Sequence, residues 1–151
     1  MKLRSCFESM CECQVINSLP PEALEDLRQL YISAGWITPE ENGRFLVPVL
    51  KQSAVAVAVF DGGKLVGFGR ALSDNCSDAY IQDVVVAPDH RKRGIGGMIV
   101  RRIVRELRGR GVDWIGLAGE PGTEHFYAGL GFNAMPRHTL WIVPDDAGEK
   151  F

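Results

Sequence analysis

The spacing of apolar and polar residues predicts regular elements from the start of the chain. Residues 12–17 fit a first strand. Apolar positions at helical spacing predict a helix that Pro20-Pro21 opens and that runs to about Ser33. We expect a second helix to begin at residues 38–41, where a threonine can cap, a proline suits the first helical position and a glutamate completes a capping box. Pro48 interrupts the pattern of this second helix.

The middle of the chain predicts an antiparallel meander that leads into a helix and a parallel strand. Asp61-Gly62-Gly63-Lys64 predicts a hairpin turn, and an apolar stripe that repeats every four residues predicts a helix from about Gly94 to Arg108. A strand, a helix and a strand in this order imply a parallel pair. The β-branched runs that predict the strands are residues 55–60, 65–72, 79–86 and 113–118.

The end of the chain predicts a short helix over residues 123–130 and one or two strands within residues 132–142. The expected fold class is therefore α/β, with a central mixed sheet, antiparallel early and parallel in the middle, and helices on both faces. The chain has 151 residues and neither a repeat nor a linker. It fits a single domain over residues 1–151, with its core at about 12–142.

Composition narrows the classes of protein that fit. Apolar residues make up 46% and charged residues 24%, which excludes a disordered chain. The longest apolar run, residues 54–60, is too short for a membrane helix, and the first residues lack the apolar core of a secretory signal. Two CxxC pairs are absent, so we expect no metal site and plain thiols in a cytoplasmic protein; the cysteines are Cys6, Cys11, Cys13 and Cys76.

The net charge of −2 hides a local excess of basic residues. Residues 91–110 hold eight of the seventeen lysines and arginines, and Glu106 is the one acidic residue in that segment. Such a positive field suits a small polyanionic ligand. A solvated helix face and a nucleic-acid surface are the alternatives, and the overall acidic charge argues against the second.

The most informative segment is the basic loop between the valine run at residues 84–86 and the helix that follows. The continuous valines predict burial on both faces of the sheet. Free amides at a helix N-terminus bind phosphate, and glycines let the backbone approach a ligand; here they are Gly94, Gly96 and Gly97. The dinucleotide fingerprint needs glycine where Ile99 stands, and the Gly-Lys-Ser/Thr of a P-loop is absent.

The pattern Arg91-x-x-Gly94-x-Gly96 after a valine-rich strand resembles the coenzyme A pyrophosphate motif of the GNAT superfamily, the acyl-CoA-dependent N-acetyltransferases. Residues 120–132, with a Phe-Tyr pair before a Gly-Phe turn, are similar to a later motif of that family. The resemblance covers about residues 12–142. It implies a GNAT-like fold and direct transfer of an acetyl group from the cosubstrate acetyl-CoA to an amine.

The resemblance also implies which residues form the cofactor site. The pyrophosphate and the peptide-like arm of the coenzyme are expected along Val84, Val85, Val86, Arg91, Lys92, Arg93, Gly94, Ile95, Gly96 and Gly97. A backbone amide near Val85 would face the thioester oxygen and stabilise its developing charge. Glu120 stands where many relatives carry a cofactor-binding asparagine, so that role is not assigned to it.

Four residues are candidates for the chemistry. The family places a tyrosine that matches Tyr127 at the coenzyme sulfur, so we expect Tyr127 to protonate the departing thiolate. Tyr80 and Gln82 lie on the strand where relatives often place the base or its water relay, but neither is a good base. Asp83 is the nearest carboxylate and would attract a cationic substrate. Strand alternation points Asp83 to the other face from Gln82, unless a bulge turns it.

The acceptor site is the least defined part. In this family residues 20–50 shape it, and Tyr31, Trp36 and Phe45 are candidates for an apolar pocket, with Glu40 as a free carboxylate. The acceptor is a small amine, an exposed lysine or an N-terminal amine. In the later motif we expect His125 to face solvent and three apolar side chains to lie in the core, namely Phe126, Leu130 and Phe132.

A second functional class stays open because no clear base is present. This alternative is a catalytically silent acyl-CoA-binding or sensing module. Neither a membrane nor a nucleic acid is an expected partner. A homodimer is an option, because dimers are frequent in the family, although no sequence feature fixes one.

Overall fold

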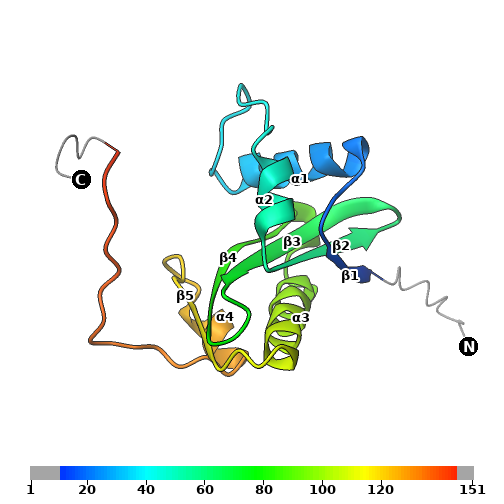
Figure 1. Ribbon diagram of the computed structural model, residues 1–151. Coiled ribbons are helices and arrows are strands. Elements are labelled where there is room, and N and C mark those ends of the chain that lie inside the picture. Colours follow the sequence, from blue (N-terminus) through cyan, green and yellow to red (C-terminus); the bar gives the residue numbers. More distant parts are fainter. Residues whose placement is uncertain (1–10, 146–151) are drawn as a thin grey trace, which may run out of the picture. The chain divides into compact units, whose positions relative to one another are not determined.

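The computed structural model describes residues 11–145, and a five-stranded sheet dominates its first part (Figure 1). The strands follow each other across the sheet in chain order. All neighbours are antiparallel except the last pair, which is parallel, so the predicted meander and parallel strand are confirmed. The strands are β1 Glu12–Ile16, β2 Val55–Asp61, β3 Lys64–Ser73, β4 Asp78–Val86 and β5 Trp114–Leu117.

Two amphipathic helices pack on opposite faces of this sheet (Figure 1). α1, Pro21–Ser33, lies on the face where Phe68 of β3 meets Tyr31, with the two ring centroids 6.2 Å apart. α3, Ile95–Gly109, packs its buried isoleucines on the strand positions next to Phe68, which point to the other face. The expected α/β class, a mixed sheet with helices on both faces, is therefore confirmed.

β3 has glycine at the two positions where α3 comes closest to the sheet. A Cβ atom on Gly67 would lie 2.8 Å from Cγ2 of Ile95 and 2.9 Å from Cδ1 of Ile99. A Cβ atom on Gly69 would lie 2.6 Å from Cγ2 of Ile99. At these distances a side chain at either position would force Ile95, Ile99 or the helix itself to shift. The two glycines therefore set how deeply α3 packs, and with it where the first turn of α3 lies beside the end of β4.

The second helix does not begin where the sequence predicts it. The Glu41 carboxylate accepts a hydrogen bond from the Thr38 amide at 2.7 Å, as in a capping box, but the turn ends there and α2 spans Leu46–Gln52. Gly43 has a φ of +69°, which a right-handed helix does not permit. Pro48 lies in the first turn of α2, where its missing N–H costs no helical hydrogen bond.

Arg28 of α1 holds the irregular segment between α1 and α2. Its Nε donates to the Glu41 carbonyl at 2.8 Å, and its Nη2 donates to the Pro39 carbonyl. The Nη1 group pairs with Glu25 on the same helix at 2.9 Å. The guanidinium thus satisfies carbonyls that a continued helix would otherwise use, and this stabilises the non-helical path.

The chain divides into two compact units after Leu117, and the second contains α4, Glu124–Gly129. No strand forms within residues 132–142, so the prediction of final strands is wrong for the described structure. The exposed run at residues 140–143 has high β propensity, but a strand needs a partner for its backbone groups, and no described residue pairs with this run. The single domain over residues 1–151 stays a prediction.

Across residues 11–145, no helix is both long and apolar enough to cross a bilayer.

We predict that Gly69→Ala lowers the free energy of unfolding by about 1–3 kcal/mol, because the added methyl group overpacks the contact with Ile99. Urea denaturation followed by far-UV circular dichroism measures the change. Gly109→Ala is the matched control, since a Cβ atom there meets nothing within 4 Å and alanine favours a helix more than glycine does. Equal stability of Gly69→Ala and the wild type would contradict the described packing of α3.

Candidate active site

The loop between β4 and α3 leaves the first amides of α3 free. The chain passes through a short 3-10 helix, η1 Pro88–His90, and then through Lys92 with a φ of +59° and Gly94 with a φ of +80°. Gly94 is the N-cap of α3 and supplies no side-chain hydrogen bond. The amides that follow have no acceptor within the helix, so they can bind an anion such as phosphate. These amides belong to Ile95, Gly96 and Gly97.

The three glycines of the motif play different structural roles. Only Gly94 has a left-handed backbone, a conformation that favours glycine. Gly96 and Gly97 lie inside α3 with helical geometry, and Gly97 is buried. Of the three, Gly94 therefore shapes the loop before the helix, whereas Gly96 and Gly97 belong to the helix itself.

The carboxyl end of β4 is open on the side of β5. β5 ends at Leu117, which pairs with Ile81, so within residues 11–145 no strand pairs with residues 82–86 on that side. The opposite side of β4 is occupied by β3. An open strand edge offers amides and carbonyls to a peptide-like ligand. Val85 is buried whereas its two valine neighbours are half-buried, so the run is not buried on both faces as predicted.

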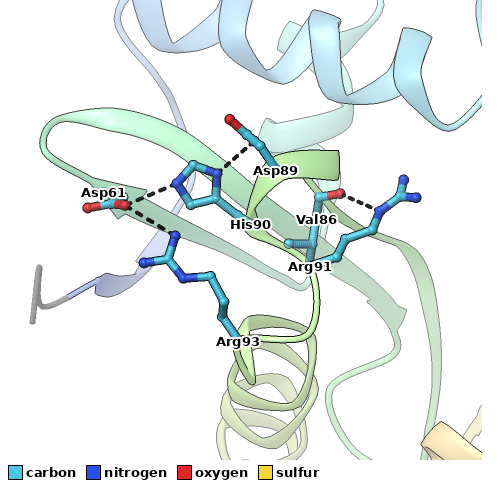
Figure 2. A network of polar contacts seen from close by, with 6 residues as sticks. All are labelled: Asp61, Val86, Asp89, His90, Arg91 and Arg93. Atoms are coloured by element: carbon cyan, nitrogen blue, oxygen red, sulfur yellow. Dashed lines mark hydrogen bonds and ion pairs between the residues drawn. The ribbon is translucent and has the colours of Figure 1, made fainter.

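The basic side chains of the loop point in different directions (Figure 2). Arg91 donates from Nε to the Val86 carbonyl at 3.3 Å. Arg93 lies toward the hairpin between β2 and β3, with its Nη1 3.8 Å from Oδ2 of Asp61. Lys92 is exposed. The phosphate charges of a ligand at the α3 N-terminus would therefore meet Arg91 and Lys92 while Arg93 is paired with Asp61.

Asp83 lies at the centre of a polar network on the α1 face of the sheet. Its Oδ2 accepts hydrogen bonds from the Tyr31 hydroxyl at 2.8 Å and from Nε of Arg70 at 2.5 Å. Arg70 also donates from Nη2 to Oε1 of Gln82 at 3.0 Å. Among the described residues the hydrogen bonds to Asp83 all fall on Oδ2, which leaves Oδ1 for a ligand. The carboxylate side chain is 24% exposed, so a ligand can reach it.

A bulge in β4 explains why Gln82 and Asp83 reach the same arginine. The register between β3 and β4 shifts between Phe68 and Arg70, and Asp83 has a φ of +56°. Strand alternation alone would send the two side chains to opposite faces. The bulge turns Asp83 back to the face of Gln82, which is the exception that the sequence analysis allowed.

The other strand candidates have defined surroundings. Tyr80 stacks on Trp114 of β5, with ring centroids 6.5 Å apart and planes 25° from parallel. Gln82 uses its amide oxygen to accept from Arg70, as described above. Neither side chain is a base, so the structure adds no strong proton acceptor to the site.

An aromatic wall lies next to Asp83. Tyr31 is buried, and its ring contacts Trp36 at a centroid distance of 5.1 Å and Phe45 at 5.8 Å. Trp36 and Phe45 are 38% and 41% exposed, so they present apolar surface to solvent. Burial and the adjacent Asp83 carboxylate raise the pKa of Tyr31 well above its ordinary value. Its hydroxyl therefore stays protonated and keeps donating to Asp83.

In the second unit, Tyr127 lies on α4 between two other aromatic side chains. Its ring centroid lies 4.9 Å from that of Phe126 and 5.8 Å from that of Phe132. Burial and the nearby Glu120 carboxylate raise the pKa of Tyr127. His125 is exposed as expected. Phe126 is 38% exposed and no residue of this group is fully buried, so the predicted core of Phe126, Leu130 and Phe132 is wrong.

Three residues that organise the site were not predicted from the sequence. Arg70 orients Asp83 and Gln82, and Asp61 and His90 hold the loop before α3. Arg70 belongs to no motif, and only its place three positions before the end of β3 distinguishes it. His90 lies inside the basic loop between β4 and α3, so its position in the sequence was the one signal of a role in the site.

Within residues 11–145 no group of three or more His, Cys, Asp or Glu side chains could hold a metal ion. Cys11, Cys13 and Cys76 are free thiols, and Cys6 lies outside the described residues.

Comparison with known proteins shows relatives of this chain. A family model described as the acetyltransferase (GNAT) family matches residues 14–132. The uncharacterized N-acetyltransferase ycf52 of Pyropia yezoensis is 36% identical over 118 residues, which make up 75% of this chain and 66% of that protein. Serotonin N-acetyltransferase 2, chloroplastic, of Oryza sativa subsp. japonica is 42% identical over 74 residues, which make up 49% of this chain and 37% of that protein.

A solved structure has the same fold. A GNAT-family acetyltransferase from Streptococcus pneumoniae TIGR4 is 25% identical, covers 89% of this chain and 98% of its own, and gives a TM-score of 0.70. The expected GNAT-like fold is therefore confirmed. The chain spans just under two thirds of the length of the ycf52 protein, at 66%.

We predict that Asp83→Asn lowers the free energy of unfolding by about 1–3 kcal/mol, because Arg70 loses the charge of its half-buried partner. Urea denaturation at neutral pH measures the change. Asp78→Asn on the same strand is the matched control, since Asp78 is exposed and its carboxylate makes no described hydrogen bond. A loss no larger than that of the control would mean that the Asp83 network does not stabilise the fold.

Proposed function

Because the chain belongs to the acetyltransferase (GNAT) family, we propose that it transfers the acetyl group of acetyl-CoA directly to an amine. One observation carries the proposal: the open edge of β4 at residues 82–86 is joined by the single loop of residues 87–94 to the free amides at the start of α3. A strand edge suits the peptide-like arm of coenzyme A, and the helix N-terminus suits its pyrophosphate.

The cofactor side of the site is assigned residue by residue. Ile95, Gly96 and Gly97 would offer backbone amides to the pyrophosphate, with Arg91 and Lys92 as positive charges beside them. Val84, Val85 and Val86 would offer backbone groups to the arm. An amide near Val85 would stabilise the negative charge that develops on the thioester oxygen.

The chemistry needs the movement of two protons. The neutral amine nitrogen attacks the thioester carbonyl carbon, the carbon–sulfur bond breaks, and coenzyme A leaves as a thiolate. Tyr127 supplies a proton to that sulfur, and its raised pKa keeps the hydroxyl protonated at neutral pH. The proton that the attacking amine loses passes to water. Asp83 contributes charge, because Tyr31 and Arg70 already occupy its Oδ2.

The acceptor that fits this site best is an amine with an aromatic group. Trp36 and Phe45 present exposed aromatic surface against Tyr31, and Tyr31 in turn donates to Asp83. An aromatic ring would stack on this wall while its amino group approaches Oδ1 of Asp83 as an ammonium. The ammonium then releases a proton to water and becomes the neutral amine that attacks. A relative that is named a serotonin N-acetyltransferase supports the same class of acceptor.

The compartment and the oligomeric state are also proposals. Free thiols at Cys11, Cys13 and Cys76 support a reducing compartment, and we propose the cytoplasm. A homodimer stays a prediction that sedimentation measurements can test. A catalytically silent acyl-CoA-binding module would bind acetyl-CoA and release no thiol in the assays below.

Tyr127→Phe is expected to lower kcat by about 10²–10⁴-fold, because it removes the proton donor and keeps the aromatic packing. Release of free thiol from acetyl-CoA under saturating acceptor measures kcat. The Kd for acetyl-CoA should change little, which separates loss of the acid from loss of the binding site. Full turnover in the variant, with chemistry shown to limit the rate, would mean that water protonates the thiolate.

An acceptor panel tests the substrate class. With acetyl-CoA present, aromatic alkylamines such as serotonin and tryptamine should give kcat/KM values about 10-fold or more above those of spermidine and free lysine, because only the former stack on the wall. Trp36→Ala should raise the KM of the aromatic amines selectively. Val47→Ala, which shortens an exposed apolar side chain on α2, is the control. A preference for spermidine, unchanged in Trp36→Ala, would contradict the aromatic acceptor.

A further inference from the structure

His90 bridges the cofactor loop and the hairpin between β2 and β3 (Figure 2). Its Nδ1 lies 2.8 Å from Oδ1 of Asp89, the residue before it in η1. Its Nε2 lies 3.0 Å from Oδ2 of Asp61, which is 29 residues away at the end of β2. The imidazole is 15% exposed and the Asp61 carboxylate 17%, so this contact is largely shielded from water.

The bridge lies only a few residues before the proposed phosphate site. Four residues separate His90 from Ile95, whose amide opens α3, and the chain between them turns through two left-handed residues, Lys92 and Gly94. Such a segment has no regular hydrogen bonds of its own to fix its path. The contact with Asp61 ties its start to the sheet, and Arg93 reaches the same Asp61 oxygen at 3.8 Å.

We propose that His90 is a positioning residue that latches the cofactor loop to the β2–β3 hairpin by bridging Asp61 and Asp89. The proposal rests on the acetyl-CoA site proposed above. When the latch is closed, the loop holds the free amides of α3 in the arrangement that receives the pyrophosphate. When it opens, the competent arrangement is less populated and the apparent Kd for acetyl-CoA rises.

The latch depends on the charge of the imidazole. A protonated ring donates from both nitrogens, one to each carboxylate, whereas a neutral ring has a single N–H and points a lone pair at the other carboxylate. The charged groups around the ring are the carboxylates Asp61 and Asp89, the opposing Arg93, and Lys64, which acts on Asp89. Asp89 first and then Asp61 raise the pKa of His90 above its ordinary value of 6.5, against opposing effects of burial and Arg93.

The sign of the pH dependence follows from this direction. A raised pKa means that the folded loop favours the protonated ring. The latch is therefore complete below the ordinary histidine pKa and is lost as the pH rises through the raised value. Affinity for acetyl-CoA should fall over that interval.

The test compares His90→Gln with the wild type by calorimetric titration of acetyl-CoA across pH. Because the ligand's own phosphate also titrates, the quantity to follow is the ratio of the two Kd values at each pH. We expect the variant to bind about 3- to 10-fold more weakly near pH 6, and the ratio to approach 1 near pH 9. His138→Gln is the matched control, with a ratio of 1 throughout, since His138 is exposed and forms no described side-chain hydrogen bond.

A second measurement depends neither on the fold of His90→Gln nor on ligand binding. NMR titration of the His90 ring in the wild type should give a pKa above 6.5, and Asp61→Asn should lower it. A Kd ratio that is the same at all pH values would overturn the latch. So would a His90 pKa that is equal in the wild type and in Asp61→Asn. Failure of the wild type to bind acetyl-CoA at any pH would overturn the proposed function instead. The NMR titration would still show whether His90 interacts with Asp61.

Discussion

The close approach of α3 to β3 is the contact on which the proposed cofactor site depends. Side chains at positions 67 and 69 of β3 would collide with Ile95 and Ile99, so the helix reaches its depth only because both positions are glycine. The same helix carries the free amides at its first turn. A packing constraint in the core therefore fixes the height of those amides relative to the open end of β4, and the binding geometry follows from the core.

The bulge at Asp83 has a comparable role for the acceptor side. A φ of +56° is unfavourable for an aspartate, and it persists where surrounding contacts hold it. Arg70 and Tyr31 supply these contacts from β3 and α1. The network thus joins the sheet to α1, whose Tyr31 contacts Trp36 and Phe45 of the aromatic wall. Because Tyr31 and Arg70 both donate to Oδ2 of Asp83, the fold uses one carboxylate oxygen. The other, Oδ1, can bind the proposed substrate.

Much of the fold could be predicted from the sequence, because β-branched runs, a Gly-Gly turn and a four-residue apolar repeat are local signals. The glycine motif likewise located the cofactor loop. The remaining features depend on contacts between distant residues. Arg28 stabilises a non-helical path at residues 39–41, where the capping box favours a helix. The bulge turns Asp83, and His90 contacts Asp61, which lies 29 residues away. Residues 132–142 show the converse, since their β propensity has no partner strand among the described residues.

The anchoring of the α1–α2 segment by Arg28 has a consequence for how acceptor preference can diverge. The guanidinium binds main-chain carbonyls at Pro39 and Glu41, and every residue type provides such a carbonyl. Side chains along this segment, including those that border the aromatic wall, are therefore free to change without loss of the anchor. Substitutions at exposed positions of this segment can therefore alter the proposed acceptor preference while Arg28 keeps the main chain in place.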